Sequence, residues 1–560
     1  MKKILAFVLS FTLVIGVVFC SPVSFAADKS IRFAVASDLH IDTQRETLPV
    51  NYPDSELYFH GGGSGNLYDE GPALVKTFLN QAKEQDVDFV LIPGDMTRSG
   101  TAQQHKFVAK MFEDFKNETG IKCYVVPGNH DFYNSTRDEF KEYYKNVCYC
   151  DALVIDSETA SYTADLPNGY RLIAVDSNKP GDDGDGMTDR LYNWIDEQVA
   201  SAHKDGREII YSMHHTLLEH IVLAKLVIKD FIVRDSDKAA ERFCEWGIQY
   251  TFTGHEHGND IAKFTGKNGN VLYDVLTTAL SSYPLDYRIV DFNEQGATFT
   301  IKSIDECDFS ALIDGYNEKQ LELMKADYNA YSLGMFKYSI EQKILEYTSP
   351  EFIKKKLKID DGNVLSNEID ALMSLVGYTL DMPIYDSGDG RLSLQTLAQQ
   401  KGVSLPESEY KSLADLITSV AAMHYHGDEN MPAGEYPECE LFIKGLNTGL
   451  EFILSNADRE AVKALVGGSE FEVVFGDYSQ SLRNWILAAA RGGEDTYEIA
   501  EEILYPLFNK LLVDEGPADR NVTLPAIGET VTTQTRIMIF VEKLINVLKY
   551  ILNIVFAVIR

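Results

Sequence analysis

The stretch QYTFTGHEHGND, residues 249–260, places two histidines directly after a run that is typical of a buried β-strand. Residues 249–254 are mainly β-branched and aromatic and end at Gly254, which favours a strand followed by a turn. Histidine is scarce in this chain, at 12 of 560 residues. His255 and His257 stand at positions i and i+2, and such side chains on an extended segment point to the same side. The stretch therefore predicts two imidazoles that reach into one cleft.

Similar apolar runs recur throughout residues 31–305 and alternate with helical patterns such as 72–85 and 101–118. Buried strands that alternate with helices are typical of a layered α/β domain. The stretch 271–302 predicts further strands that close this domain. The other expected strands are 31–37, 87–93, 122–128, 170–176, 207–213 and 249–254.

Four of the other predicted strands also end in residues that bind metal ions. Ligands of layered α/β folds bind outside the carboxyl ends of the strands, so these residues are expected to meet. With His255 and His257 they supply two carboxylates, an amide oxygen and four or five imidazoles, which is enough for two divalent ions that share a carboxylate. The alternative, that all are ordinary loop residues, is disfavoured because five such motifs follow apolar strands. The four motifs are SDLH (37–40) with Asp38 and His40, PGDMT (93–97) with Asp95, PGNHD (127–131) with Asn129, His130 and Asp131, and SMHHT (212–216) with His214 and His215.

The order DxH, GD, GNHD, H and GHxH resembles the calcineurin-like metallophosphoesterases, and among them the bacterial cyclic-nucleotide and glycerophosphodiester phosphodiesterases. The segments that carry the resemblance are ASDLHID, PGDMTRSG, VPGNHDFYN, YSMHHT and FTGHEHGND, and they lie within residues 31–303. The resemblance implies a layered β-sandwich flanked by helices. It also implies hydrolysis of a small-molecule phosphate ester, a diester in preference to a monoester, by a hydroxide that bridges two metal ions.

The resemblance further implies a set of metal ligands in which Asp95 bridges the two ions. His214 is preferred to His215 because the family ligand is usually the first residue of this short segment. Mixed imidazole and oxygen ligands suit two divalent or trivalent ions of Mn, Fe or Zn, without choosing among them. One ion is expected on Asp38, His40, Asp95 and His257, and the other on Asp95, Asn129, His214 and His255.

Two further residues of the PGNHD motif are expected to take part in catalysis. His130 is not needed as a ligand, and beside Asp131, which can orient it, it is placed to protonate the departing alkoxide or to stabilise phosphate charge. Arg98 stands one position away from the arginine of the family's GDxxDR variant, and its role stays open.

The N-terminus predicts a secretion signal. Lys2 and Lys3 precede an apolar stretch at 4–19, and Ser24-Phe25-Ala26 offers small residues for cleavage after Ala26. An uncleaved anchor is the alternative. We therefore expect a protein outside the cytoplasm, secreted or at the cell surface, where disulfides between its remaining cysteines are permitted.

Helical periodicity replaces the strand pattern after residue 305. We expect a signal peptide at 1–26, a catalytic domain at 27–305, an all-α domain of unknown role at 306–535 and an amphipathic apolar helix at 536–560. The last helix either lies at a membrane surface or packs on the helical domain. The insert 43–70 forms either a rim beside the site or a plain surface loop. His424 and His426 are expected in solvent at a helix end, with a second metal site as the alternative.

The composition limits the binding partners. A formal charge of −34 and a pI of about 4.7 disfavour nucleic acid as a partner, because the chain repels a polyanion. A phosphate substrate then needs local positive charge, which bound metal ions would supply. Two alternatives to a phosphodiesterase stay open: a non-catalytic cell-surface binding protein on the same fold, and a nucleotidase with a separate substrate-gripping domain.

Overall fold

The computed structural model describes residues 29–43, 65–179, 184–220, 231–307 and, with several gaps, 322–527. The predicted signal peptide 1–26, most of the insert 43–70 and the predicted tail helix 536–560 lie outside these residues. Across the described segments, none of the helices combines the length and the apolar character that a membrane crossing requires.

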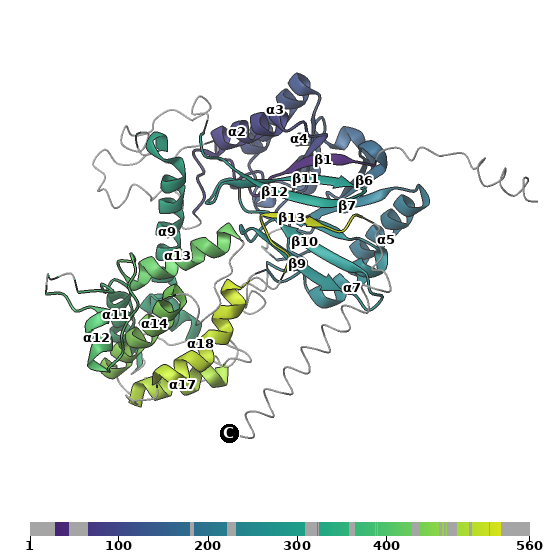
Figure 1. Ribbon diagram of the computed structural model, residues 1–560. Helices are drawn as coiled ribbons and strands as arrows, with labels where there is room; N and C mark the ends of the chain where they lie inside the picture. The colour runs from purple at the N-terminus through teal and green to yellow at the C-terminus, as the bar shows by residue number, and fades with distance from the viewer. Residues whose placement is uncertain are drawn as a thin grey trace, which may run out of the picture.

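Two β-sheets lie face to face, with helices on their outer sides (Figure 1). Phe33 in the first sheet meets Phe252 in the second edge to face, with ring centroids 5.3 Å apart, so one apolar core fills the space between the sheets. The six-stranded sheet has the order β13 (Asn521–Leu524), β12 (Gly296–Ser303), β11 (Asp286–Asn293), β1 (Ile31–Val35), β2 (Phe89–Ile92), β3 (Lys122–Val125). The seven-stranded sheet has the order β4 (Ala152–Ile155), β5 (Tyr162–Asp165), β6 (Tyr170–Val175), β7 (Glu208–Met213), β8 (Tyr250–Thr253), β10 (Val271–Leu276), β9 (Asp260–Thr265).

The central strands of both sheets run parallel. In the first sheet β1, β2 and β3 are parallel neighbours, and in the second β6, β7, β8 and β10 are. Parallel strands deliver their carboxyl ends to the same edge of a sheet. This is why motifs far apart in the sequence come together at one edge.

The helices of the catalytic region begin and end where local signals place them. Thr101 and Gln104 form a capping box at the start of α3, and Gly120 ends it in a left-handed conformation with φ of +79°. Thr136 and Glu139 form a second capping box at the start of α4. These helices are α2 (Gly71–Glu84), α3 (Ala102–Thr119), α4 (Arg137–Tyr143), α5 (Asp189–Lys204) and α7 (Ser236–Trp246), with 3-10 turns η3 (His130–Phe132), η4 (Tyr149–Asp151) and η5 (Pro167–Gly169).

The region after β12 is helical and has an apolar core of its own. The predicted fold class, a layered α/β sandwich with helices and a helical C-terminal region, is confirmed. The helices are α9 (Tyr328–Tyr347), α10 (Pro350–Leu357), α11 (Leu365–Leu380), α12 (Leu394–Gln400), α13 (Leu413–His426), α14 (Pro437–Asn456), α17 (Ser479–Arg491) and α18 (Thr496–Leu512). Cys123, Cys148, Cys150 and Cys244 are free thiols.

One strand departs from the all-α expectation for residues 306–535. Asn521–Leu524 forms β13 and pairs antiparallel with β12 at the edge of the first sheet. A segment of four residues carries too little periodic signal to be recognised alone, and the exposed edge of β12 supplies the partner that fixes it. The domain boundary between residues 305 and 306 stays a prediction. The later part of the chain nevertheless contributes β13 to the six-stranded sheet.

Candidate metal centre

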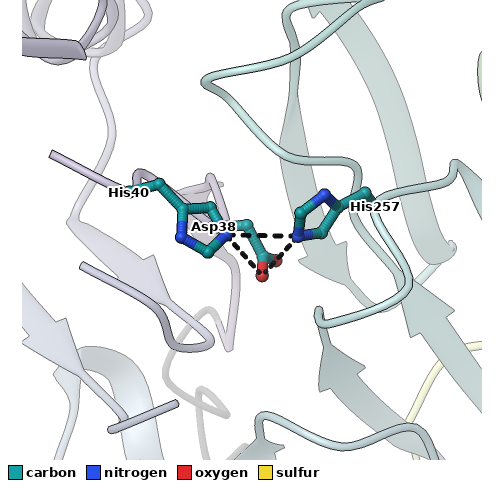
Figure 2. Close-up of side chains that lie close together, drawn as sticks. All are labelled: Asp38, His40 and His257. Atoms are coloured by element: carbon teal, nitrogen blue, oxygen red, sulfur yellow. Dashed lines mark hydrogen bonds and ion pairs between the residues drawn. The ribbon is translucent and has the colours of Figure 1, made fainter. Parts of the chain in front are cut away.

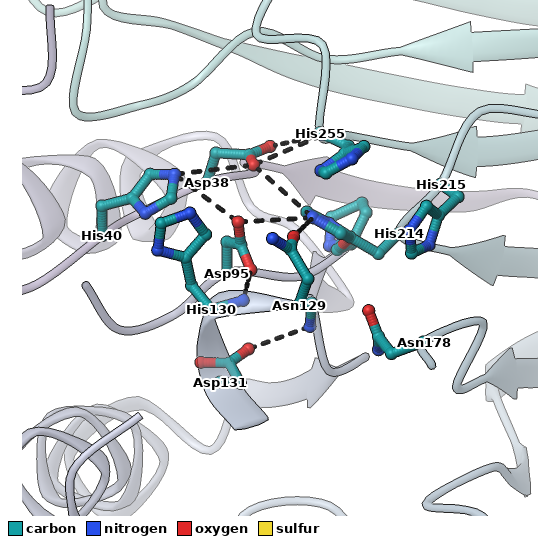
Figure 3. A network of polar contacts seen from close by, with 12 residues as sticks. Asp38, His40, Asp95, Asn129, His130, Asp131, Asn178, His214, His215 and His255 are labelled. Atoms are coloured by element: carbon teal, nitrogen blue, oxygen red, sulfur yellow. Dashed lines mark hydrogen bonds and ion pairs between the residues drawn. The ribbon is translucent and has the colours of Figure 1, made fainter. Parts of the chain in front are cut away.

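The structure brings all seven predicted ligands together at the carboxyl ends of β1, β2, β3, β7 and β8. Figure 3 shows six of them, and Figure 2 shows His257 beside Asp38 and His40. Six of the ligands, together with His130, form three groups of three side chains. Within each group, the metal-binding atoms all lie within 4.8 Å of one another. The groups are Asp38 with His40 and His257, Asp95 with His214 and His255, and His40 with Asp95 and His130.

The first group is compact (Figure 2). The Nε2 atoms of His40 and His257 lie 3.2 Å apart. Asp38 Oδ1 is 3.2 Å from His257 Nε2 and 3.8 Å from His40 Nε2. Asp38 and His40 are almost fully buried. Two imidazole nitrogens and a carboxylate oxygen therefore face one point. The alternation expected for an extended segment is not the cause, because Asp38, His40 and His257 have left-handed backbone conformations.

Asp95 lies between the two main groups. Its Oδ2 is 3.6 Å from His40 Nε2 on one side and 3.3 Å from His214 Nε2 on the other. Asn129 Oδ1 approaches the same His214 Nε2 at 3.2 Å. Asp95 is thus within reach of both groups, and the carboxamide oxygen of Asn129 lies on the side of His214.

Five of these residues hold backbone conformations that residues other than glycine seldom adopt. The φ angles are +53° at Asp38, +42° at His40, +51° at Asp95, +74° at His255 and +62° at His257. Asp and His tolerate this left-handed region better than most residues, and such conformations cluster at functional sites. The strand ends thus turn abruptly, which directs the side chains inward.

Glycines beside these turns allow the ligands to approach closely. A Cβ atom at Gly94 would overlap the His214 ring, and one at Gly254 would overlap Asp38. A Cβ at Gly128 would overlap the Asp95 carboxylate and lie 2.5 Å from the Asp95 backbone nitrogen. The glycines of the PGD, PGN and TGH motifs are therefore required by packing at the site itself.

The electrostatics favour metal-binding protonation states. Burial alone would raise the pKa of Asp95, but the neighbouring His214 and His130 hold it well below its usual range. Burial lowers the pKa of His214, yet the Asp95 carboxylate outweighs it and raises this pKa to about 9. Burial lowers the pKa of His40 to about 3 and that of His255 well below its ordinary value. An anionic carboxylate and neutral imidazoles are the forms that bind metal, and an ion on His214 would displace its proton.

The residues present fit metal ions. His255 Nε2 is buried and has no hydrogen-bond partner among the residues that the structure describes, and a buried polar atom of this kind is costly unless a ligand satisfies it. The neighbouring donors are imidazole nitrogens and carboxylate oxygens, which suit Mn, Fe or Zn. The structure thus supports metal binding at the predicted ligands, while the number and identity of the ions belong to the proposal below.

The structure corrects the predicted partner of His130. Its Nδ1 lies 2.6 Å from the Arg98 carbonyl oxygen, which orients the ring. The Asp131 carboxylate points away and accepts from the backbone nitrogens of Thr97 at 3.1 Å and Gly128 at 3.0 Å. The two side chains diverge because they are adjacent in the 3-10 turn η3. Asp131 therefore holds the loops after β2 and β3 together, and does not orient His130.

The structure also places the residues whose roles were open. His215 turns to Ser177, with Nδ1 and Oγ 2.9 Å apart, so His214 and not His215 faces Asp95. Arg98 donates to Asp42 at 3.0 Å and lies over the Tyr68 ring, 4.2 Å from its centroid. His424 and His426 lie in the last turn of α13 and belong to none of the metal-binding groups among the described residues.

Sequence reasoning missed the loop after β6. Ser177 supports His215, and Asn178 donates to the Pro127 carbonyl oxygen at 2.7 Å beside the PGN motif (Figure 3). The signal was present in the polar run DSN at the end of a predicted strand. Such a run is also common in ordinary turns, so the sequence alone does not predict a role for it at the site.

Comparison with known proteins defines the class. Residues 31–259 match the family described as calcineurin-like phosphoesterase. This match agrees with the resemblance that the motifs predicted: residues 31–259 are similar to calcineurin-like phosphoesterases, and the curated relatives support the predicted enzyme class, a metal-dependent phosphoric ester hydrolase.

The chain is 26% identical over 170 residues to a probable glycerophosphodiester phosphodiesterase from Arcobacter nitrofigilis, which covers 30% of this chain and 56% of that protein. It is 22% identical over 214 residues to a probable cyclic nucleotide phosphodiesterase from Rhodococcus erythropolis, which covers 37% of this chain and 65% of that protein. A dimetal phosphatase from Danio rerio aligns with a TM-score of 0.36 and 11% identity over 50% of this chain and 98% of that one. The chain thus spans less than two thirds of the length of these curated relatives.

Proposed function

We propose that this protein hydrolyses phosphate esters, with phosphodiesters as its preferred substrates, and that it holds two metal ions on the predicted ligands. The observation that carries the proposal is the position of Asp95 between two groups of ligands, 3.6 Å from His40 Nε2 and 3.3 Å from His214 Nε2. The curated relatives named as probable phosphodiesterases support the preference for diesters.

The bound ions would supply positive charge for the phosphate and lower the pKa of a water molecule towards neutrality. In a chain with a formal charge of −34, this charge attracts an anionic substrate to a site that contains two buried carboxylates, Asp38 and Asp95. The imidazoles of His40 and His255 complete the ligand set without adding negative charge.

His130 is placed to manage the proton of the leaving group. The hydrogen bond to the Arg98 carbonyl fixes its Nδ1 as the donor nitrogen, so the opposite nitrogen is directed away from that contact. A donor atom of His130 lies within 4.8 Å of donor atoms of His40 and Asp95, and the side chain is only partly buried. A protonated His130 would donate to the departing alkoxide oxygen.

The proposed activity is tested on the purified chain with Mn²⁺ and two chromogenic substrates, bis(p-nitrophenyl) phosphate and p-nitrophenyl phosphate. We expect faster hydrolysis of the diester, loss of activity with a chelator, and about two ions per chain by elemental analysis. Asn129→Ala and His255→Ala are each expected to lose most of the activity while the circular dichroism spectrum is retained.

His203→Ala is the matched control, because His203 lies on the exposed side of α5. A chain with two bound ions and no activity on any phosphate ester would refute the proposal. A fully active His130→Ala would refute only the proton-donor role.

We also propose that the protein acts outside the cytoplasm, on the basis of the lysines, apolar stretch and Ala26 cleavage position in residues 1–26. Expression of the full chain in a bacterial host, followed by N-terminal sequencing of the exported protein, is expected to begin at Ala27. Retention of Met1 on a cytoplasmic product would contradict this proposal.

A further inference from the structure

The helical region touches the candidate metal centre at two places. The last turn of α13 meets the loop that carries His255 and His257, and α9 meets the segment 65–70 and the residues around Tyr283. These two helices extend from the helical region to the sheets (Figure 1). The question is what these contacts do for the metal ligands.

At the end of α13, backbone carbonyl groups that have no partner within the helix accept hydrogen bonds from Asn259, in the loop after His257, and from Arg520. The final carbonyl groups of an α-helix have no partners within the helix. Here the Tyr425 carbonyl accepts from the Asn259 backbone nitrogen at 3.2 Å, and the His426 carbonyl accepts from the Arg520 side chain at 2.7 Å. Arg520 and Asn259 also both donate to the buried Asp286 carboxylate, at 2.6 and 2.9 Å. Asn259, two residues after His257, is thus held both by the end of α13 and by Asp286 of β11.

Gly427 makes this contact close. It has a left-handed φ of +81°, and a Cβ atom there would lie 2.7 Å from the Asn259 carbonyl oxygen and 3.1 Å from the Cβ atoms of Asn259 and Asp519. Any side chain at this position would push α13 away from the ligand loop.

The contact at α9 leads to Asp38. Phe336 packs against Gly65, where an added Cβ would lie 3.4 Å from the Phe336 backbone, and its ring lies 5.8 Å from that of Tyr283. Ser282 donates to the Gly65 carbonyl at 3.1 Å. The neighbouring Ser281 donates to the Asp38 carbonyl at 2.9 Å.

Both contacts lead first to one group of ligands, although His255 of the other group lies on the same loop as His257 and its backbone nitrogen donates to the Asp38 carboxylate. Asp38 and His257 belong to the group completed by His40. The other group is positioned by the catalytic region: His214 Nδ1 lies 2.9 Å from the Pro93 carbonyl oxygen, and the Asp95 carboxylate accepts from the His130 backbone nitrogen at 2.9 Å.

We propose that the helical region, through α9 and the α13 terminus with Arg520, positions one of the two metal sites, that of Asp38, His40 and His257, and leaves the other to the catalytic region. Tyr425, Gly427, Phe336 and Arg520 are then positioning residues for this ion. The inference rests on the proposed function in that it takes these ligands to hold metal.

The test is Gly427→Ala in the full chain, with Gly402→Ala as the matched control. Gly402 also has a positive φ, of +74°, but a Cβ there meets nothing within 4 Å, so it controls for a substitution at a positive-φ glycine away from the contact. Mn²⁺ titration of the metal-free proteins by electron paramagnetic resonance and calorimetry counts the ions and measures both affinities. We expect Gly427→Ala to lower the affinity for one Mn²⁺ ion by about tenfold or more and to leave the affinity for the other unchanged. Gly402→Ala is expected to bind both ions with the affinities of the unmodified chain.

Phe336→Leu tests the contact at α9 by the same titration and is expected to lower the affinity for the same ion. If the thermal unfolding midpoint shows that Gly427→Ala does not fold, Phe336→Leu alone tests the inference. Equal weakening of both ions, or two unchanged affinities in Gly427→Ala and Phe336→Leu, would overturn the inference and leave the proposed function standing. If the unmodified chain binds no Mn²⁺, the proposed function fails, and the inference fails with it.

Discussion

Replacing Asp131 by Asn tests whether this carboxylate holds two ligand loops together. Oδ1 accepts from the Thr97 backbone nitrogen at 3.1 Å and from its hydroxyl at 2.8 Å. Oδ2 accepts from the backbone nitrogens of Gly128 at 3.0 Å and Met96 at 3.3 Å. Asp131 is fully buried, so water cannot take over these contacts. The two loops carry Asp95 and Asn129.

The expected loss of stability follows from the donors left without an acceptor. An amide keeps one acceptor oxygen and presents a donor on the other side, so one or two of the four donors lose their partner. Each buried donor without an acceptor costs about 1–3 kcal/mol, which predicts a loss of about 2–4 kcal/mol for Asp131→Asn. Against a typical free energy of unfolding of about 5–15 kcal/mol, this is readily measured.

The assay is urea unfolding followed by far-ultraviolet circular dichroism, in the presence of a chelator so that metal binding does not contribute. It is run at pH 8, because burial and the nearby Asp95 raise the pKa of Asp131 to about 7. Because this pKa lies above that of an unfolded chain, the unmodified chain gains stability as the pH falls below about 7, so the difference between the two proteins is expected to widen there. Asp138→Asn is the control, since that carboxylate is exposed, and no shift of its midpoint is expected.

An Asp131→Asn variant as stable as the unmodified chain at pH 8 would refute the reasoning about the loops. Unchanged stability together with lost activity would instead return Asp131 to the direct catalytic role that the sequence first suggested.

Two further predictions concern neighbouring residues. Gly128→Ala is expected to abolish the proposed phosphodiesterase activity, because the added Cβ would overlap the Asp95 carboxylate. Gly120→Ala, where a Cβ meets nothing within 4 Å, is the control. An active Gly128→Ala would contradict the packing argument. Burial lowers the pKa of His105 to about 4, below about 6.5 for an unfolded chain, so its contribution to stability is complete above pH 6.5 and is lost as the pH falls towards 4. The free energies of unfolding of the unmodified chain and of His105→Gln, measured with urea, should therefore converge by about 3 kcal/mol over that range. A difference between them that does not vary with pH would show that His105 is not kept neutral by burial.

The sequence predicted the strands and the ligands because both signals are local. Apolar runs of four to eight residues mark buried strands, and the strands found at Phe89–Ile92 and Tyr250–Thr253 lie inside the runs that were expected. The ligands stand directly after these runs, as predicted, but left-handed turns and not extended alternation direct the side chains of Asp38, His40, His255 and His257 to the site. Parallel pairing of the strands then brings the sets together.

Several features of the site depend on partners distant in the sequence, and no local pattern reports them. The choice between Asp131 and the Arg98 carbonyl as the partner of His130 is decided by how the 3-10 turn packs against the loop after β2. Likewise, β13 forms because β12 offers a free edge more than 200 residues earlier in the chain.

The sequence by itself determined the layered α/β class, the helical character of the later region and the strand-end positions of the candidate ligands, since periodicity and strand-end position are properties of neighbouring residues. The family resemblance then selected seven ligands among them. Only the tertiary structure decided that Asp95 lies between two groups of ligands, that His214 faces them while His215 turns to Ser177, and that the carbonyl groups at the end of α13 fix the loop of His257. These arrangements join segments up to several hundred residues apart, and their geometry exists only once both sheets and the helical region have packed.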